Sequence, residues 1–270
     1  AIISDYISVN FVERIFDNPT LYSGVENLMG VYGYALQIYC DFSGYSDMAI
    51  GIALLLGFHF NLNFNSPYKS ASITEFWRRW HISLTTWFRD YIYIPLGGSR
   101  CSKWKSFRNT MIIFLVSGLW HGANWTFICW GAFHALLFLP LLLMGRNRKY
   151  KDIVAENKYL PSLKELGQII STFILVMIGW VIFRAENIKE AYQYIIYMFT
   201  KWQPSSLEYG VKCIQYIAIL IIIEWINRRK MHGLEINIKY PIIRWGIYCA
   251  IFYYIFYYSN DIQTFIYFQF

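Results

Sequence analysis

The stretch "WTFICWGAFHALLFLPLLLM", residues 125–144, contains no acidic or basic side chain apart from His134. About 20 apolar residues in succession are enough for an α-helix to cross a lipid bilayer. We therefore predict a membrane-spanning helix over 125–144.

The composition extends this prediction to the whole chain. Of its 270 residues, 56% are hydrophobic and only 15% are charged, whereas about 25% of a soluble domain is charged. Further apolar segments lie at 168–183, 214–226, 242–258 and 30–60, the last interrupted by Asp41 and Asp47. We predict an all-α polytopic membrane protein.

The domain organisation is simple. No linker rich in glycine, serine or proline divides the chain, so we expect a single transmembrane domain over residues 1–270. The sequence starts at Ala1, with no initiator methionine and no signal peptide. We expect it to be the C-terminal part of a longer protein that supplies further N-terminal helices.

The formal net charge of +7 is concentrated between the apolar segments. Because an excess of Lys and Arg marks cytoplasmic loops, this pattern indicates a lipid bilayer as the partner, and no nucleic acid. Segments 100–108 and 146–151 are basic and should share the cytoplasmic side, as should 228–230, whereas 184–210 is mixed in sign and should be external. The chain between the first two must turn back, and we place that turn at Trp120–Asn124.

Two acidic residues interrupt the apolar segment at 30–60. Gln37, Asp41 and Tyr45 follow one another at four-residue spacing, so they share one face of a helix. Either this face forms a structural network with neighbouring helices, or Asp41 belongs to the wall of a polar cavity.

Residues 72–98, "SITEFWRRWHISLTTWFRDYIYIPLGG", have aromatic and apolar residues at three- or four-residue spacing. Ser72 and Glu75 form a capping-box signature for the start of a helix. Its charged residues leave two interpretations open. The helix lies at the membrane interface with its rings at headgroup level, or it enters the protein and lines a cavity.

A second stripe of this segment consists of Arg78, His81 and Thr85. Clustered arginines such as Arg78 and Arg79 suit phosphate-bearing ligands, because a guanidinium makes bidentate contacts. The same charges disfavour a protonated imidazole at His81.

His121 is the strongest catalytic candidate. It adjoins Gly122 at the predicted turn, where a substrate could approach the backbone, and a neutral imidazole there is suited to general-base catalysis. His134 lies 13 residues further on, about 20 Å along a continuous helix. The two could not then act on the same atom. A lone histidine in an apolar helix is more often a buried structural residue than a functional one, and both roles stay open for His134.

The sequence contains few signs of other chemistry. The five histidines lack the spacing of a metal site, and none is predicted. The five cysteines are scattered in mostly apolar surroundings, which is typical of buried hydrophobic residues rather than of disulfides or zinc ligands.

Four stretches occur together in this order: "DFSGYSDMAIGIALLLGF" (41–58), "FWRRWHISLTTWFRDYIYIPLGG" (76–98), "SGLWHGANWTFICWGAFH" (117–134) and "GWVIFRAENIKEAYQYIIYMF" (179–199), before a final "TFIYFQF". Their combination resembles the membrane-bound O-acyltransferase family, and within it the alginate O-acetyltransferase branch. The resemblance extends from about residue 30 to the end.

The resemblance implies a helical bundle with re-entrant or interfacial helices around a central funnel or tunnel, in the bacterial cytoplasmic membrane. It implies transfer of an acetyl group from cytoplasmic acetyl-CoA to hydroxyls of an exopolysaccharide, directly or through an extracytoplasmic relay protein. No bound cofactor is expected. The family's catalytic histidine matches His121, and a second family histidine matches His81.

The remaining candidates are assigned to the substrates. We expect Asn124 to donate a hydrogen bond to the oxyanion. Residues expected to hold the donor or line its path are Arg78, Arg79, Arg89, Trp120 and Asp41.

Two alternatives stay open at this point. A related enzyme would transfer D-alanine from a carrier protein to teichoic acid. A protein of a different class would be a transporter or channel in which the histidines relay protons.

Overall fold

The computed structural model describes residues 2–145, 154–155, 158–201, 218, 220–228, 230 and 238–258. Over these residues the protein is helical and contains no strand. The elements are α1 (Ile2–Ile7), η1 (Ser8–Val12), α2 (Glu13–Asp17), η2 (Pro19–Leu21), α3 (Gly24–Leu55), η3 (Pro67–Lys69), α4 (Ile73–Arg79), α5 (Ile82–Phe88), η4 (Arg89–Tyr93), α6 (Lys103–His121), α7 (Trp125–Leu143), α8 (Leu163–Arg184), α9 (Ile188–Thr200) and α11 (Pro241–Tyr258).

Several segments predicted from the sequence lie partly or wholly outside the described residues. The predicted loop 146–151 and the C-terminal "TFIYFQF" lie outside them. Of the predicted span 214–226, only 218 and 220–226 are described.

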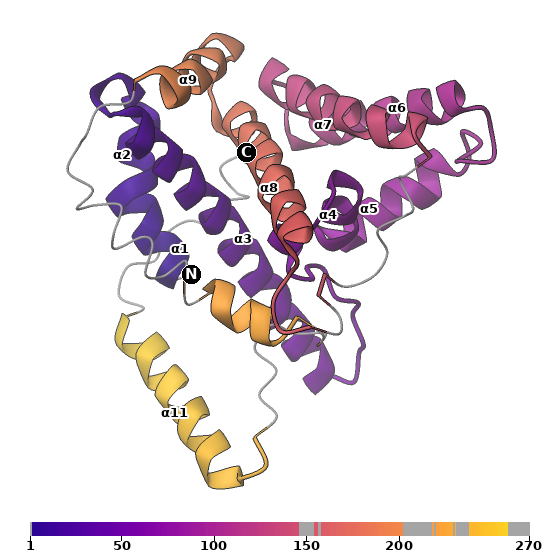
Figure 1. Ribbon diagram of the computed structural model, residues 1–270. Coiled ribbons are helices and arrows are strands. Elements are labelled where there is room, and N and C mark those ends of the chain that lie inside the picture. The colour runs from indigo at the N-terminus through magenta and orange to yellow at the C-terminus, as the bar shows by residue number, and fades with distance from the viewer. Residues whose placement is uncertain are drawn as a thin grey trace.

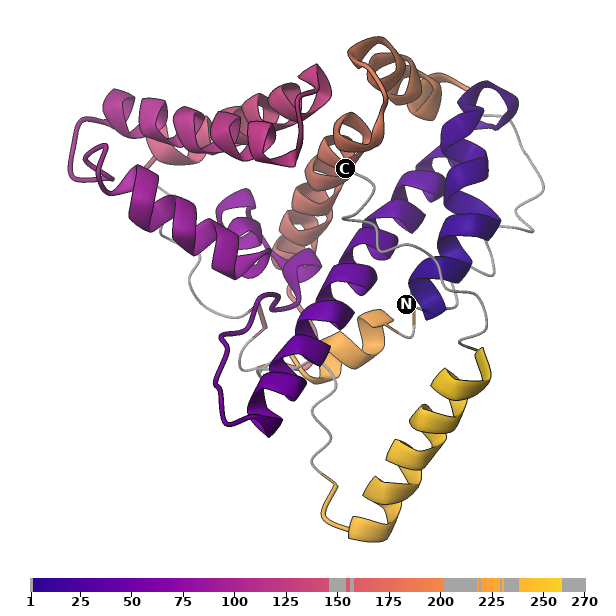
Figure 2. The same ribbon diagram turned by 180° about the vertical axis from the view of Figure 1, so that it is seen from behind.

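The helices are arranged around α3 and α8 (Figures 1 and 2). The α1, η1 and α2 segments pack along α3, while α9 contacts both α3 and α8. Helices α6 and α7 form a hairpin whose α7 contacts α8. The short helices α4 and α5 lie below this hairpin (Figure 1), and α11 stands apart from the other helices in both views.

Serine and asparagine side chains set the first residue of several helices. The Ser23 hydroxyl and the Glu26 carboxylate form a capping box at α3, and Ser162 with Glu165 does the same at α8. Asn187 accepts from the backbone of Glu190 at α9. Each cap satisfies backbone N–H groups that have no partner inside the helix.

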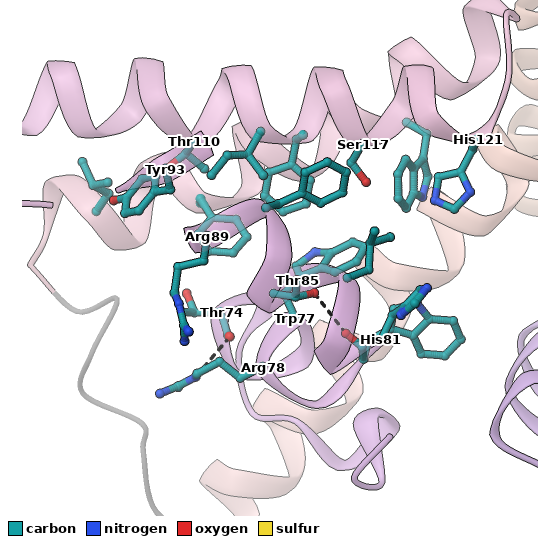
Figure 3. Close-up of a pocket in the computed structure, with 18 of the residues that line it drawn as sticks. Thr74, Trp77, Arg78, His81, Thr85, Arg89, Tyr93, Thr110, Ser117 and His121 are labelled. Atoms are coloured by element: carbon teal, nitrogen blue, oxygen red, sulfur yellow. Dashed lines mark hydrogen bonds between the residues drawn. The ribbon is translucent and has the colours of Figure 1, made fainter. Parts of the chain in front are cut away.

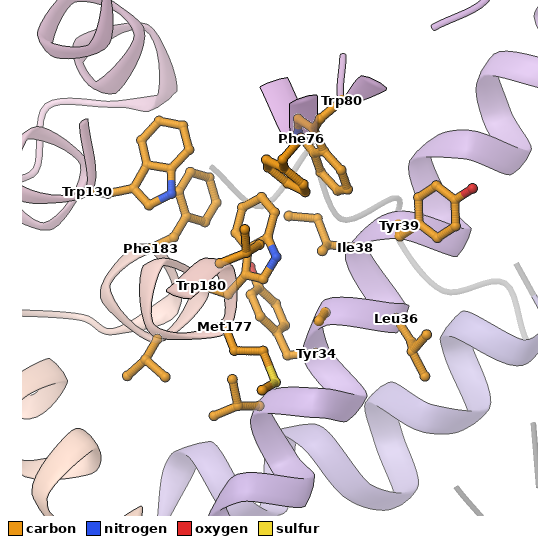
Figure 4. Packing of buried hydrophobic residues seen from close by; sticks show 14 of the residues in the cluster. Tyr34, Leu36, Ile38, Tyr39, Phe76, Trp80, Trp130, Met177, Trp180 and Phe183 are labelled. Atoms are coloured by element: carbon orange, nitrogen blue, oxygen red, sulfur yellow. The ribbon is translucent and has the colours of Figure 1, made fainter. Parts of the chain in front are cut away.

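Aromatic side chains fill the centre of the molecule (Figure 4). The rings of Trp80 and Trp180 lie 5.0 Å apart and those of Trp130 and Phe183 5.2 Å apart, so α4, α7 and α8 meet in one cluster. Tyr34 of α3 is fully buried against it. Burial of such large rings is a major source of stability.

Two helices among the described residues, α7 and α8, are long and apolar enough to cross a membrane. They correspond to the predicted spans at 125–144 and 168–183. Helix α11 covers the predicted span at 242–258, whereas α3 covers only 30–55 of the predicted span at 30–60, because it ends at Leu55. Neither helix meets the same combined requirement of length and composition.

The hairpin turn falls where the sequence predicts it. Helix α6 ends at His121, Gly122 has a φ of +146°, and Asn124 caps α7. The distance expected between His121 and His134 was wrong, because no continuous helix joins them. The rings of both instead contact Trp130, at 5.3 and 5.2 Å.

Two further helix predictions need correction. Residues 72–98 do not form one helix, because the backbone breaks at Trp80 and His81 between α4 and α5. The basic segment 100–108 is not a loop throughout, since α6 begins at Lys103 behind the cap of Ser102.

Candidate active site

A cavity of about 420 Å³ lies between the α6–α7 hairpin and the α4, α5 and η4 segments (Figure 3). Most of its lining is aromatic or aliphatic, as in Trp77, Trp130 and Phe183. The cavity is within the size range of small-molecule sites, which are mostly apolar with a few polar groups. Its cationic and imidazole side chains are those of Arg78, Arg89, His81 and His121.

His121 reaches the cavity from the last turn of α6. Its ring lies 5.0 Å from that of Phe183 and 5.3 Å from that of Trp130, both nearly edge-on. The helix ends here because Gly122 has a φ of +146°, a conformation that favours glycine. A Cβ at that position would also lie 2.8 Å from the Phe127 ring.

His81 reaches the same cavity from the break between α4 and α5. Its backbone is left-handed, with φ +45° and ψ +56°, which is costly for a residue with a Cβ. It lies outside α7 and α8, the two helices that are long and apolar enough to cross a membrane. Burial lowers the pKa of His81 to about 4, and the neighbouring His121 acts in the same direction, so the imidazole is neutral at pH 7.

The cationic and imidazole groups occupy different parts of the cavity. Figure 3 shows Arg78 and Arg89 toward one end and the two histidines toward the other. Arg89 Nε lies 2.7 Å from Asp90 Oδ1, and this pair is about half exposed. Arg78 Nε donates to the Thr74 carbonyl at 3.3 Å. The predicted stripe of Arg78, His81 and Thr85 therefore lines one cavity despite the break in the helix.

Arg79 does not line the cavity and takes part in a structural ion pair. Its guanidinium contacts Glu75 Oε1 at 2.9 Å and donates to the Asn65 carbonyl at 3.1 Å. Glu75 in turn accepts from the backbone N–H of Ala71 at 2.8 Å. This pair ties α4 to the preceding loop.

The other candidate substrate residues also lie outside the cavity lining. Asn124 caps α7 by accepting from Thr126 N at 3.1 Å, and its Nδ2 donates to the Glu186 carbonyl at 3.0 Å. It therefore links the hairpin turn to the segment between α8 and α9. Trp120 is 65% exposed, and Asp41 is half-buried on α3.

His134 is 1% exposed in the packed interior. The indole Nε1–H of Trp77 lies 3.4 Å from His134 Nδ1. A Cβ on Gly179 would come within 2.6 Å of His134 Nε2, so α8 approaches this ring closely. These contacts agree with a structural role, and His134 lies behind Trp77 rather than in the cavity lining.

Several polar residues of the site were not predicted from the sequence, and Ser117 and Asn63 are two of them. Ser117 lines the cavity one turn before His121 (Figure 3), and their four-residue spacing could have indicated the shared face. Asn63 bonds to His81 from a loop 18 residues earlier, and no periodic pattern points to it.

The sequence profile of the membrane-bound O-acyltransferase family matches residues 7–155. This chain belongs to the membrane-bound O-acyltransferase family. The expected resemblance is confirmed, and the two histidines and two arginines of the cavity lie within the matched region, whereas Phe183 lies beyond it.

Relatives with assigned names support the same family. Over 219 residues the chain is 44% identical to a protein from Pseudomonas aeruginosa named "Probable alginate O-acetylase", covering 79% of this chain and 40% of that protein. It is 40% identical over 184 residues to a peptidoglycan O-acetyltransferase from Helicobacter pylori, which covers 68% of this chain and 33% of that protein.

A more distant relative, a teichoic acid D-alanyltransferase from Bacillus subtilis, is 34% identical over 171 residues, covering 59% of this chain and 41% of the relative. The chain thus spans about two fifths of the length of the curated relatives it matches.

Proposed function

We propose that this chain carries the active site of a bacterial membrane-bound O-acetyltransferase, which moves an acetyl group from acetyl-CoA to hydroxyls of a surface polysaccharide. The observation that carries the proposal is the position of His81 and His121 on one apolar cavity whose other end holds Arg78 and Arg89. The names of the alginate and peptidoglycan relatives support acetyl as the group and a polysaccharide as the acceptor.

In the proposed reaction His121 is the general base. As the acceptor hydroxyl oxygen bonds to the thioester carbonyl carbon, its proton passes to the neutral imidazole of His121. The carbon–sulfur bond then breaks, and the thiolate of CoA takes up a proton as it leaves. The aromatic walls exclude water, which would otherwise hydrolyse the thioester.

The arginine end of the cavity is proposed to receive the phosphates of CoA. Guanidinium groups are suited to phosphate oxygens, and Arg78 and Arg89 are exposed enough to meet a donor arriving from the aqueous phase. We place this end toward the cytoplasm and the whole protein in the cytoplasmic membrane as a multi-pass protein with a central funnel or tunnel. The acetyl group is transferred to the polysaccharide either directly or through an extracytoplasmic relay protein.

A second enzyme function is D-alanyl transfer to teichoic acid, favoured by the Bacillus subtilis relative. Its donor is a carrier protein rather than free CoA. The greater identity to the alginate and peptidoglycan relatives favours acetyl transfer. A transporter would move its solute without forming any ester.

The test uses inside-out membrane vesicles that contain the full-length protein and its surface polysaccharide. Acetyl-CoA labelled in the acetyl group should transfer label to the polysaccharide as a hydroxylamine-sensitive ester. Labelled D-alanine with its carrier protein should give no product. Transfer of D-alanine alone would replace the proposal by the second function, and movement of solute without ester formation would contradict both.

Substitution of Arg89 with alanine should raise the KM for acetyl-CoA about threefold to tenfold and change kcat less. A half-exposed arginine contributes about 1 kcal/mol to binding, and salt screens part of it. Steady-state rates at varied acetyl-CoA concentrations and two ionic strengths would measure the effect. Lys105→Ala removes an exposed cation from outside the cavity and is the matched control. An unchanged KM in Arg89→Ala would contradict a donor-binding role.

A further inference from the structure

The loop before η3 holds the backbone of His81 in its left-handed conformation. The main-chain carbonyl of Asn63 accepts from Ile82 N at 2.9 Å, and its side-chain Oδ1 accepts from Ser83 N at 3.2 Å. These are the first N–H groups of α5, whose N-cap residue His81 makes no side-chain cap. Asn63 therefore replaces the missing cap and offsets the cost of the left-handed residue.

The same contacts fix which way the Asn63 amide points. A backbone N–H can only donate, so the amide atom that faces Ser83 N must be the oxygen. The Ser83 hydroxyl also donates to this oxygen, at 2.9 Å, while the amide nitrogen donates to Ser46 Oγ of α3 at 3.1 Å. Every described contact agrees with one orientation of the amide.

The amide orientation determines the proton position on His81. Asn63 Oδ1 lies 3.2 Å from His81 Nδ1 and can only accept a hydrogen bond. The proton must therefore be on Nδ1 for this contact to be a hydrogen bond. In a neutral imidazole, Nε2 is then the nitrogen with the lone pair.

We propose that Asn63 is a positioning residue that holds His81 as the Nδ1–H tautomer, so that Nε2 acts as a hydrogen-bond acceptor. The proposal rests on the proposed function, because it gives His81 a role in it. An acceptor nitrogen receives the hydrogen of a second hydroxyl of the polysaccharide and so orients the sugar, while the attacking hydroxyl donates its own hydrogen to His121. It does not donate to the oxyanion formed from the thioester carbonyl.

The ring contacts of His81 favour a fixed orientation. The Phe42 ring lies 4.7 Å away at an interplanar angle of 89°, and the Phe64 ring lies 6.3 Å away on the same loop as Asn63. Ser83 Oγ also lies 3.4 Å from His81 Nδ1, and because its hydrogen is donated to Asn63 Oδ1 it can only accept from this nitrogen, which again places the proton on Nδ1. A ring held by these polar contacts and two aromatic neighbours retains one tautomer and one direction. Both properties are needed to orient a hydroxyl.

The direct test is ¹⁵N NMR of the full-length protein labelled at histidine, with His81→Gln used to identify the His81 signals. At pH 7 the wild-type protein should show a protonated Nδ1 and an unprotonated Nε2. Asn63→Leu should lose this pattern. A wild-type His81 with its proton on Nε2 would overturn the proposal, whatever the activity.

A second variant covers the case in which Asn63→Leu does not fold. Asn63→Asp keeps the oxygen and the side-chain size, but its negative charge favours the imidazolium form of His81. The acidic limb of the pH–rate profile should therefore move up by about one pH unit or more. Ser46→Ala, which removes only the partner of the amide nitrogen, should leave this limb in place.

The two proposals fail in different ways. An acidic limb that does not move in Asn63→Asp would overturn the role of Asn63. A wild-type protein that forms no ester would overturn the proposed function, and the NMR spectra would still decide the tautomer.

Discussion

Replacement of His121 with alanine should lower the rate of ester formation by about 10²- to 10⁴-fold, the usual contribution of a general base. The imidazole lies on the cavity at the end of α6, among the rings of Trp130 and Phe183. Alanine leaves nothing in the cavity at that position to take the hydroxyl proton. Ester-linked acetate on the secreted polysaccharide, measured at matched membrane levels of protein, gives the effect.

The matched control for this variant is His59→Ala. His59 is exposed after the end of α3 and lies outside the cavity lining, so its loss should leave the acetate content unchanged. Normal ester content in His121→Ala would contradict the assigned role and make His81 the better candidate for the base. Reduced ester with a reduced amount of protein would indicate a folding defect, so the membrane level is measured in every variant.

The α6–α7 hairpin could be predicted from the sequence because its signals are local. An uninterrupted apolar segment gives α7, Gly122 permits a positive φ, and Asn124 has the side chain of a helix cap. The predicted turn at Trp120–Asn124 therefore agrees with the structure. The start of α6 was harder to predict, because the basic residues that follow Ser102 suggest a loop although they form the first turns of a helix.

The break at His81 could not be predicted in this way. Aromatic residues continue at helical spacing through it, and no glycine or proline marks it. The cause is tertiary, because Asn65 N donates to the Arg79 carbonyl at 3.0 Å and Ile82 N donates to the Asn63 carbonyl. These partners lie 14 to 19 residues apart, beyond the range of any helical pattern.

The arginine cluster shows how one residue type serves two purposes. Arg78 and Arg89 line the cavity, whereas Arg79 pairs with Glu75. Glu75 and Arg79 are four residues apart, which is the spacing of an ion pair on one face of a helix. The pairing of Arg79 with Glu75 could therefore have been predicted from the sequence. Which face of the short helix meets the cavity depends on the packing of α4 against α7 and α8.

The geometry of the hairpin depends on two glycines where α6 and α7 meet. A Cβ on Gly131 would lie 2.2 Å from the Phe114 carbonyl oxygen, and one on Gly118 would lie 2.4 Å from the Phe127 carbonyl oxygen. The two backbones are thus in direct contact, as small residues allow in membrane helices. This contact sets the positions of His121 and Trp130 on the cavity.

Gly131→Ala should therefore destabilise the protein by about 1–3 kcal/mol, the usual cost of adding a methyl group to a packed site. The cost should lie at the upper end, because the obstacle is backbone rather than a flexible side chain. Thermal unfolding of the purified protein in detergent measures the change. Gly167→Ala is the matched control on α8, where a Cβ meets nothing within 4 Å, and alanine there should stabilise the helix by about 0.5–1 kcal/mol. An unchanged unfolding temperature in Gly131→Ala would contradict the close approach of α6 and α7. A lower temperature together with reduced ester formation would show that this contact also holds His121 in place.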